Sequence, residues 1–426
     1  MIIEIRAKNC FVFDEQIAFS MKADMRNKKL ASNVHKENNF SVLKTAGIYG
    51  PNNAGKTCLI KCINSIKSIL LNNKIHNLMP NIFSKNAVCE LGITFLNDGR
   101  KFSYDFKYDV EKEEYIYESF IEILKDQYNN EKEVCWLKRD TKHDNYDCQD
   151  KELLSMIPVV TKSNILFHLI DTNKFPSINE MKKILIGFAN KIDIINMNNI
   201  PMKHTIELMK NKNKLQGKVV DFIKNADLYL DNFEYVEMNG IKIKGADLDE
   251  QAEEQVLNLP ENFMEQIRLV STYKGVQVPS VFFDSTGTKK IAALASYVIE
   301  ALEQGRIIVV DELDSSIHFK LTRAVVAMFN NELNTNAQMI FTVHDVNLMD
   351  CKRLFRKEQI WFVNKDNEGV YVYSLADFTA ENGVRDTSDI IEKYRKGAFA
   401  ALPDPELINS LLSIKGNNKD GKLDGK

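Results

Sequence analysis

The sequence predicts an α/β fold with mixed β-sheets, in which a mainly helical region is inserted between two lobes. Three observations predict it. First, a buried strand, a glycine-rich turn and a helix follow one another over 42–71. Second, β/α alternation returns after residue 277, and third, helical periodicity dominates the region between these two parts. We expect an N-terminal lobe over 1–125, a mainly helical insertion over 126–277, a C-terminal lobe over 278–403 and a disordered tail over 404–426.

Length and composition describe an ordinary globular chain. Its 426 residues allow two or three structural units. The net charge of -3 gives no overall argument for nucleic acid as a partner, although a local basic face remains possible. Seven scattered cysteines indicate free thiols in a reducing compartment. With charges in the first six residues and no apolar run of membrane-spanning length, we expect a cytoplasmic protein with no membrane partner.

The N-terminal lobe is predicted to be mostly strands. "IIEIRAKNCFVF" and "QIAFSMKA" alternate as two strands around a polar turn, and 25–40 is polar and predicted as a loop. "VLKTAGIYG" is typical of a buried strand, and a helix follows from about 55 to 71. "CELGITFLNDG" and "KFSYDFKYDV" predict a hairpin around Asn97–Gly99, and "EEYIYESFIEIL" alternates as a further strand.

Helical periodicity marks the insertion, in "INEMKKILIGFANKI" and "GKVVDFIKNADLYL". The C-terminal lobe then alternates again. Its strand and helix patterns are "VPSVFF", "IAALASYVIEAL", "RIIVVDE", "LTRAVVAMFNNEL", "QMIFTVHD", "QIWFVNKD" and "VYVYSL".

One complete phosphate-binding motif stands between the predicted strand and helix. "GPNNAGKT", Gly50–Thr57, satisfies G-x-x-x-x-G-K-[ST], a P-loop whose backbone N–H groups converge on phosphate oxygens. Lys56 is expected to reach the β- and γ-phosphates of ATP and the Thr57 hydroxyl to ligate Mg²⁺. The expected nucleotide contacts here are Gly50, Pro51, Asn52, Asn53, Ala54, Gly55, Lys56, Thr57 and Cys58.

Two further strand ends carry polar side chains suited to this site. Asp311 ends the apolar run "RIIVVDE" and is expected to hold Mg²⁺, while Glu312 polarises the attacking water. Two acids at a strand end are commonly just solvated, but a P-loop in the same chain favours the functional interpretation. His344 follows "FTV" and is expected to hydrogen-bond the γ-phosphate, whereas the other six histidines are interpreted as structural.

A second anion-binding pattern lies far from the P-loop. "DSTGTKK" precedes an amphipathic helix, and free N–H groups at a helix start attract anions. Taken alone, the same residues also fit an ordinary serine-capped helix start.

In this order the motifs resemble the ABC-type ATPases of the SMC and DNA-repair kind. The resemblance makes Ser285–Thr288 the signature loop, Leu313–Ser316 the D-loop and His344 the switch histidine. More narrowly, the chain is similar to abortive-infection ATPases related to the overcoming-lysogenization-defect (OLD) proteins. That similarity rests on "NCFVF", "IYGPNNAGKT", "STGTKK", "VDELDSSIH", "FTVHDVNLMD", "QIWFVNKD" and "YRKGAFAALP".

The resemblance implies an ABC/SMC-type P-loop ATPase head that works as a homodimer or higher oligomer. Ser285, Gly287 and Thr288 would contact the nucleotide of a partner subunit, and Asp314 would couple the two sites. Three departures stand out: the signature is STGT, no Q-loop glutamine can be placed, and Phe319 follows His318 where relatives have proline. We also expect no toprim nuclease domain, because few residues follow Pro403.

The resemblance favours an ATP-hydrolysing enzyme of antiphage defence that controls a separately encoded effector or toxin and responds to a phage protein. Two alternatives remain: an SMC-like ATPase that binds DNA in repair or maintenance, and a nucleotide-gated antitoxin or scaffold with little hydrolysis.

Overall fold

The computed structural model describes residues 1–72, 75, 78–126, 130–171, 173–211, 214–226, 228–237, 265–379, 381, 384–385 and 388–402. The tail predicted as disordered, 404–426, lies outside these residues. None of the helices in the described ranges combines the length and the hydrophobicity that a bilayer span needs.

The first sheet has seven strands, and every neighbouring pair is antiparallel. Side chains alternate between its two faces, so one face can be buried while the other stays polar. In spatial order the strands are β10 (Asn145–Cys148), β9 (Glu131–Asp140), β8 (Glu114–Lys125), β7 (Arg100–Asp109), β6 (Val88–Asn97), β1 (Ile2–Lys8) and β2 (Ile17–Ser20).

The second sheet has six strands, of which the first five are parallel and the last is antiparallel. Every residue of the central strands β5, β15 and β16 is buried, as expected for strands covered on both faces. In spatial order the strands are β11 (Ile192–Asn196), β15 (Ile307–Asp311), β16 (Gln338–Thr342), β5 (Thr45–Tyr49), β17 (Ile360–Lys365) and β18 (Val370–Ser374).

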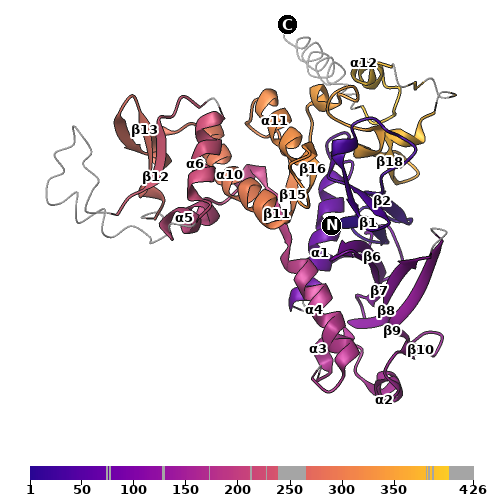
Figure 1. The fold of residues 1–426 in the computed structure, drawn as a ribbon. Coiled ribbons are helices and arrows are strands. Elements are labelled where there is room, and N and C mark those ends of the chain that lie inside the picture. The colour runs from indigo at the N-terminus through magenta and orange to yellow at the C-terminus, as the bar shows by residue number, and fades with distance from the viewer. Residues whose placement is uncertain are drawn as a thin grey trace, which may run out of the picture.

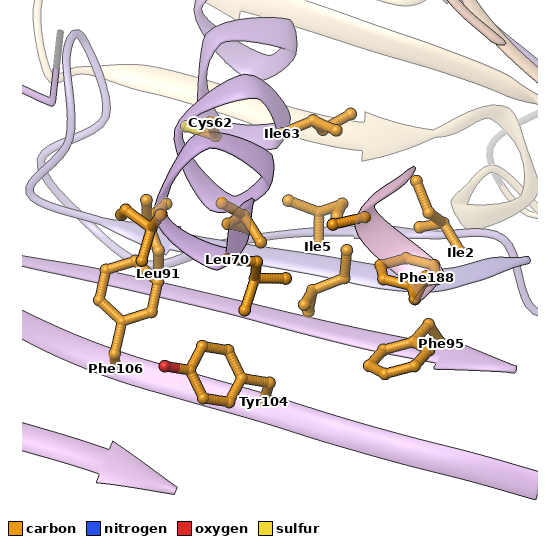
Figure 2. Packing of buried hydrophobic residues seen from close by; sticks show 14 of the residues in the cluster. Ile2, Ile5, Cys62, Ile63, Leu70, Leu91, Phe95, Tyr104, Phe106 and Phe188 are labelled. Carbon is orange, nitrogen blue, oxygen red and sulfur yellow. The ribbon is translucent and has the colours of Figure 1, made fainter. Parts of the chain in front are cut away.

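Helix α1 (Lys56–Asn72) joins the two sheets into one core. It packs against β6 of the first sheet and against β11 and β15 of the second. Figure 2 shows it lying across the first sheet, with Cys62, Ile63 and Leu70 among the fully buried side chains. Helix α4 (Pro176–Asn190) covers the same face farther along, where Phe188 stacks on Phe95 with ring centroids 4.0 Å apart.

The other face of the parallel sheet packs against α10 (Thr286–Gln304) and α11 (Phe319–Asn330). Alternate residues of β15 serve the two faces: Val309 belongs to the core around α1, and Val310 to the core around α11. Both are fully buried, so the polar residues that follow β15 emerge from a rigid base.

A separate small core forms an arm beside α10, at one side of the molecule in Figure 1. Its members are α5 (Lys203–Lys210), α6 (Gln216–Asn225) and a three-stranded antiparallel sheet of β12 (Asn232–Tyr235), β13 (Leu269–Tyr273) and β14 (Val276–Pro279). Ala292, Ala295 and Ile299 of α10 are shared with this core, so α10 connects the arm to the parallel sheet.

Short elements complete the fold. The two-stranded sheet contains β3 (Val34–Glu37) and β4 (Phe40–Leu43). The short α-helices are α2 (Lys151–Met156), α3 (Leu166–Leu169), α9 (Ser280–Phe283) and α12 (Ile390–Arg395). The 3₁₀ turns are η1 (Ala31–Asn33), η2 (Ile157–Val159), η3 (Met197–Asn199), η5 (Val346–Leu348), η6 (Lys357–Gln359) and η7 (Leu375–Asp377).

The region expected as a mainly helical insertion, 126–277, does contain α4, α5 and α6, but it is not a separate unit. Strands β9 and β10 extend the first sheet, and β11 forms an edge of the second. One smaller expectation is also corrected: β3 lies within the predicted loop 25–40. For β11 the physical reason is its pairing with β15, a strand distant in sequence that local periodicity cannot reveal, whereas β3 forms a local hairpin with β4.

A buried ion pair fastens the far end of the first sheet. Glu118 of β8 and Arg139 of β9 are directly opposite in register, fully buried and 3.0 Å apart. Glu118 also accepts hydrogen bonds from the Tyr104 hydroxyl and the Leu166 amide, and Arg139 donates to the carbonyl of Asn164. Burial raises the pKa of Glu118, and the charge of Arg139 opposes that rise.

We therefore expect Arg139→Met to lower the free energy of unfolding by about 3–5 kcal/mol, because Glu118 is left as a buried, unpaired charge. Lys112→Met is the control, since Lys112 is 71% exposed and its pair with Asp109 is worth below about 1 kcal/mol. Urea unfolding monitored by circular dichroism measures both.

The loss in Arg139→Met should also depend on pH. A carboxyl whose folded pKa lies above its unfolded pKa binds protons more readily when folded, so the deficit shrinks as pH falls through that folded pKa. Equal losses in the two variants, or a deficit that grows on acidification, would contradict this account.

Candidate functional site

The parallel sheet brings three loops together. Strands β5, β16 and β15 are neighbours and run in the same direction, so the loops after them open at one edge of the sheet. This carboxyl edge is where open α/β sheets bind ligands. The loops are the P-loop after β5, the acids at the end of β15, and the segment containing His344 after β16.

The two P-loop glycines are required by close packing and by backbone shape. Gly50 has φ 148°, and a Cβ there would lie 2.1 Å from the carbonyl oxygen of Val363 on β17. Gly55 has φ 119°, and its Cβ would meet Val12 at 2.8 Å. Asn53 adopts a left-handed conformation with φ 61°, which asparagine tolerates better than most residues. Any side chain at either glycine would deform the loop.

Lys56 lies over its own loop. Its Nζ donates to the carbonyl of Gly50 at 2.7 Å and to that of Pro51 at 3.0 Å. Burial lowers the pKa of Lys56, while the negative charges of Glu312, Asp311 and Asp314 oppose that shift. The ammonium is thus held by two carbonyl oxygens of the P-loop.

Asp311 is buried at the centre of the site, with 5% of its surface exposed. Its carboxylate accepts hydrogen bonds from Thr57 Oγ1 at 3.0 Å, Thr342 Oγ1 at 2.6 Å and Asn196 Nδ2 at 3.4 Å. These donors come from α1, β16 and β11, so three elements that are distant in sequence fix one carboxylate.

The Thr57 hydroxyl and the Asp311 carboxylate fit Mg²⁺. Both are hard oxygen ligands, and Mg²⁺ in nucleotide sites is held by one or two protein oxygens together with phosphates and water. Within the described ranges, no group of three or more His, Cys, Asp or Glu side chains could hold a metal ion. Thr57 and Asp311 therefore suit a Mg²⁺ ion whose remaining ligands are phosphate oxygens and water.

Glu312 and His344 border the same cavity, which has a volume of about 310 Å³ and also contacts Lys56, Thr57 and Lys61. Glu312 has a left-handed backbone with φ 55°, and its N–H donates to Thr342 Oγ1 at 2.7 Å. Such conformations cost about 1–3 kcal/mol and concentrate at functional sites.

The D-loop carboxylate of Asp314 holds the segment that carries His344. It accepts hydrogen bonds from the backbone N–H groups of His344 at 3.0 Å and Asp345 at 2.8 Å. The His344 side chain is exposed, so it is free to face a bound ligand. Asp314 thus fixes the backbone that carries His344 within one subunit.

The signature loop does not border the cavity. Ser285 caps α10 by accepting the Thr288 N–H at 3.1 Å, and the two hydroxyls lie 2.9 Å apart. Thr288 is buried, whereas Ser285 and Thr286 are exposed. A Cβ on Gly287 would lie 2.8 Å from the carbonyl oxygen of Ser316, so glycine permits the D-loop to approach α10.

The residue before the signature loop is anchored in the arm. The carboxylate of Asp284 is buried and accepts hydrogen bonds from the hydroxyls of Ser271 at 2.6 Å, Tyr273 at 2.7 Å and Ser280 at 2.6 Å. The start of α10 therefore has a fixed position relative to the small sheet of the arm.

The sequence did not predict several residues that the structure brings to the site. Thr342 stands two residues before the predicted His344. The signal that could have identified it is a hydroxyl side chain at the end of a predicted strand. Asn196 and Asn198 follow an apolar run, "IDII", that only its pairing with β15 reveals as a strand of this sheet.

We expect Thr342→Val to raise several-fold the magnesium concentration needed for nucleotide binding, because it removes the donor that orients Asp311 and the acceptor of the Glu312 N–H. A titration with fluorescent ATP at increasing magnesium measures this. Thr335→Val, at an exposed threonine, is the control. Unchanged magnesium dependence in Thr342→Val would argue against Asp311 as a metal ligand.

Comparisons with known proteins give one partial family match. The family model described as "AAA domain, putative AbiEii toxin, Type IV TA system" matches residues 171–350, less than half of the chain and none of the P-loop. No curated protein matches the sequence.

Solved structures of SMC heads are similar over most of the chain at 12% sequence identity. The SMC head domain from Thermotoga maritima covers 88% of this chain and 98% of its own, with a TM-score of 0.42. The SmcHead bound to the C-winged helix domain of ScpA covers 90% and 99%, with a TM-score of 0.48. The P-loop before α1, the acids at the end of β15 and the order of the parallel strands give the chain a P-loop α/β fold.

Proposed function

We propose that the protein binds and hydrolyses Mg-ATP. One observation carries the proposal: Lys56, Thr57, Asp311, Glu312 and His344, which come from three separate parts of the chain, surround one cavity at the carboxyl edge of the parallel sheet. Their side chains are of the kinds that bind phosphate, hold Mg²⁺ and activate water in phosphoryl transfer.

The roles follow from the positions. The backbone of Gly50–Lys56 surrounds the phosphates, and Lys56 exchanges its two loop carbonyls for phosphate oxygens. Mg²⁺ supplies charge neutralisation of the phosphates, and Thr57 and Asp311 hold it. Glu312 accepts a proton from the attacking water, and His344 donates to the γ-phosphate.

We propose that a second copy of the chain completes the site. The signature loop lies outside the cavity of its own subunit, with the Ser285 hydroxyl exposed at the start of the long helix α10. In a head-to-tail dimer, Ser285 and the N–H groups near Gly287 contact the partner's γ-phosphate. Thr288 is buried, so it acts by holding Ser285, and Asp314 couples the sites through the His344 segment.

The biological role that we propose is antiphage defence in the cytoplasm, in which ATP-driven closure of the oligomer controls a separately encoded effector and a phage protein triggers the change. The description of the matched family model names a toxin–antitoxin system, which supports a two-component arrangement. The arm supports a sensing role because it is joined to the signature loop through Asp284.

The first test is Glu312→Gln. The amide cannot accept the proton from water, so the turnover rate should fall at least about a hundredfold while ATP affinity is retained. Phosphate release and equilibrium binding of ATP measure the two quantities. Glu332→Gln, at an exposed glutamate outside the site, is the control. Turnover at the parent rate in Glu312→Gln would refute the assignment, and a parent protein that binds ATP without turnover would favour a nucleotide-gated scaffold.

The second test asks whether the site is shared between subunits. Lys56→Ala removes the phosphate-binding lysine, and Gly287→Val blocks the signature loop, so each variant alone should be inactive. In a mixed dimer, one site combines the intact P-loop of one chain with the intact signature loop of the other. An equal mixture should regain about a quarter of the parent rate.

Gly287→Val also presses on Ser316 within its own subunit, so Ser285→Ala serves as a second blocking variant. Mixing the two blocking variants with each other provides the negative control, because neither supplies a signature loop. If both mixtures with Lys56→Ala stay inactive while mixed dimers form by native mass spectrometry, the proposal of a shared site fails.

A further inference from the structure

Asn198 contacts Glu312 from outside the residues that line the cavity. It lies in η3, directly after β11, and Asn196 is the register partner of Asp311 across the β11–β15 pair. Met197 is fully buried and anchors the turn, and the Asn198 N–H donates to Asn196 Oδ1 at 2.9 Å. The position of the turn is therefore fixed by the sheet.

The amide of Asn198 bridges two functional segments. Its Nδ2 donates to Glu312 Oε2 at 2.5 Å, and its Oδ1 accepts from the Ser315 hydroxyl of the D-loop at 2.6 Å. Because a carboxylate only accepts hydrogen bonds, the NH₂ end must face Glu312, which leaves the carbonyl oxygen to accept from Ser315. A neutral amide thus orients Glu312 and leaves its charge intact.

The chain of contacts continues to the signature helix. Lys290, in the second turn of α10, donates from Nζ to Ser315 Oγ at 3.0 Å and to Ser316 Oγ at 3.2 Å. The carbonyl of Ser316 also lies against Gly287. An unbroken polar path therefore runs from the start of α10 through the D-loop and Asn198 to Glu312.

We propose that Asn198 is a positioning residue for Glu312, and that Ser315 and Lys290 transmit the position of the signature helix to that carboxylate. The inference rests on the proposed ATP hydrolysis. Glu312 is only partly buried, so its side chain needs a partner to hold one orientation toward the attacking water. When a partner subunit contacts the signature loop, displacement of α10 alters this hydrogen-bonded path and with it the orientation of the base.

The test begins with substitutions in the turn of the full-length protein. Asn198→Ala removes the bridge, and Asn198→Asp keeps its shape but cannot donate to Glu312. Asn199→Ala, at the exposed neighbour in the same turn, is the matched control. Steady-state kinetics give kcat and KM, equilibrium binding gives the Kd for ATP, and thermal unfolding checks the fold.

We expect Asn198→Ala and Asn198→Asp each to lower kcat about tenfold or more, with KM and the Kd for ATP unchanged, because only the geometry of the attack is affected. Asn199→Ala should keep the parent kcat. Ser315→Ala should lower kcat in the same direction, and the double variant Asn198→Ala/Ser315→Ala should be no slower than Asn198→Ala, since both act through one path.

A parent-like kcat in Asn198→Asp would overturn the proposal, because the shape of the side chain would then suffice without its donor. A loss shared by Asn199→Ala, or a change in KM in place of kcat, would overturn it equally. These outcomes are distinct from failure of the proposed function, in which the parent itself shows no turnover or Glu312→Gln retains it.

Discussion

The site depends on the placement of one buried carboxylate, that of Asp311. A charged group at this depth is tolerated only when its oxygens are satisfied, and here the donors come from α1, β16 and β11. The same requirement fixes the relative positions of the P-loop, β16 and the turn that carries Asn198. The continuous apolar run of β15 supplies the rigid support, since its residues are packed on both faces of the sheet.

Local patterns in the sequence were sufficient where each residue's role is set by its own strand or loop. The P-loop, the acids after "RIIVV" and the histidine after "FTV" are of this kind, and the structure brings them to one cavity. The mostly antiparallel character of the first lobe and the helix after the P-loop also follow from periodicity and turn residues.

The remaining features arise from pairing between distant segments. Nothing within "IDIINMNN" distinguishes a short strand from the end of the preceding helix, and only the vacant edge of β15 makes it one. Asn198 was therefore not predictable from the sequence, and neither was the place of β11 in the parallel sheet. Gly287 shows a different limit of prediction from sequence. Its sequence context indicates a ligand-binding loop, whereas the structure shows that a side chain at this position would also collide with the carbonyl oxygen of Ser316.

The sheet order also has a consequence for the synthesis of the protein. Strand β5 carries the P-loop at its end, yet both strands that pair with it, β16 and β17, are translated about three hundred residues later. Until then an apolar strand and a nascent anion-binding loop have no partners in the sheet, which favours slow folding and exposure to chaperones. The earliest functional motif to leave the ribosome thus belongs to one of the last parts of the protein to become ordered, and a chain interrupted before residue 338 cannot form the site.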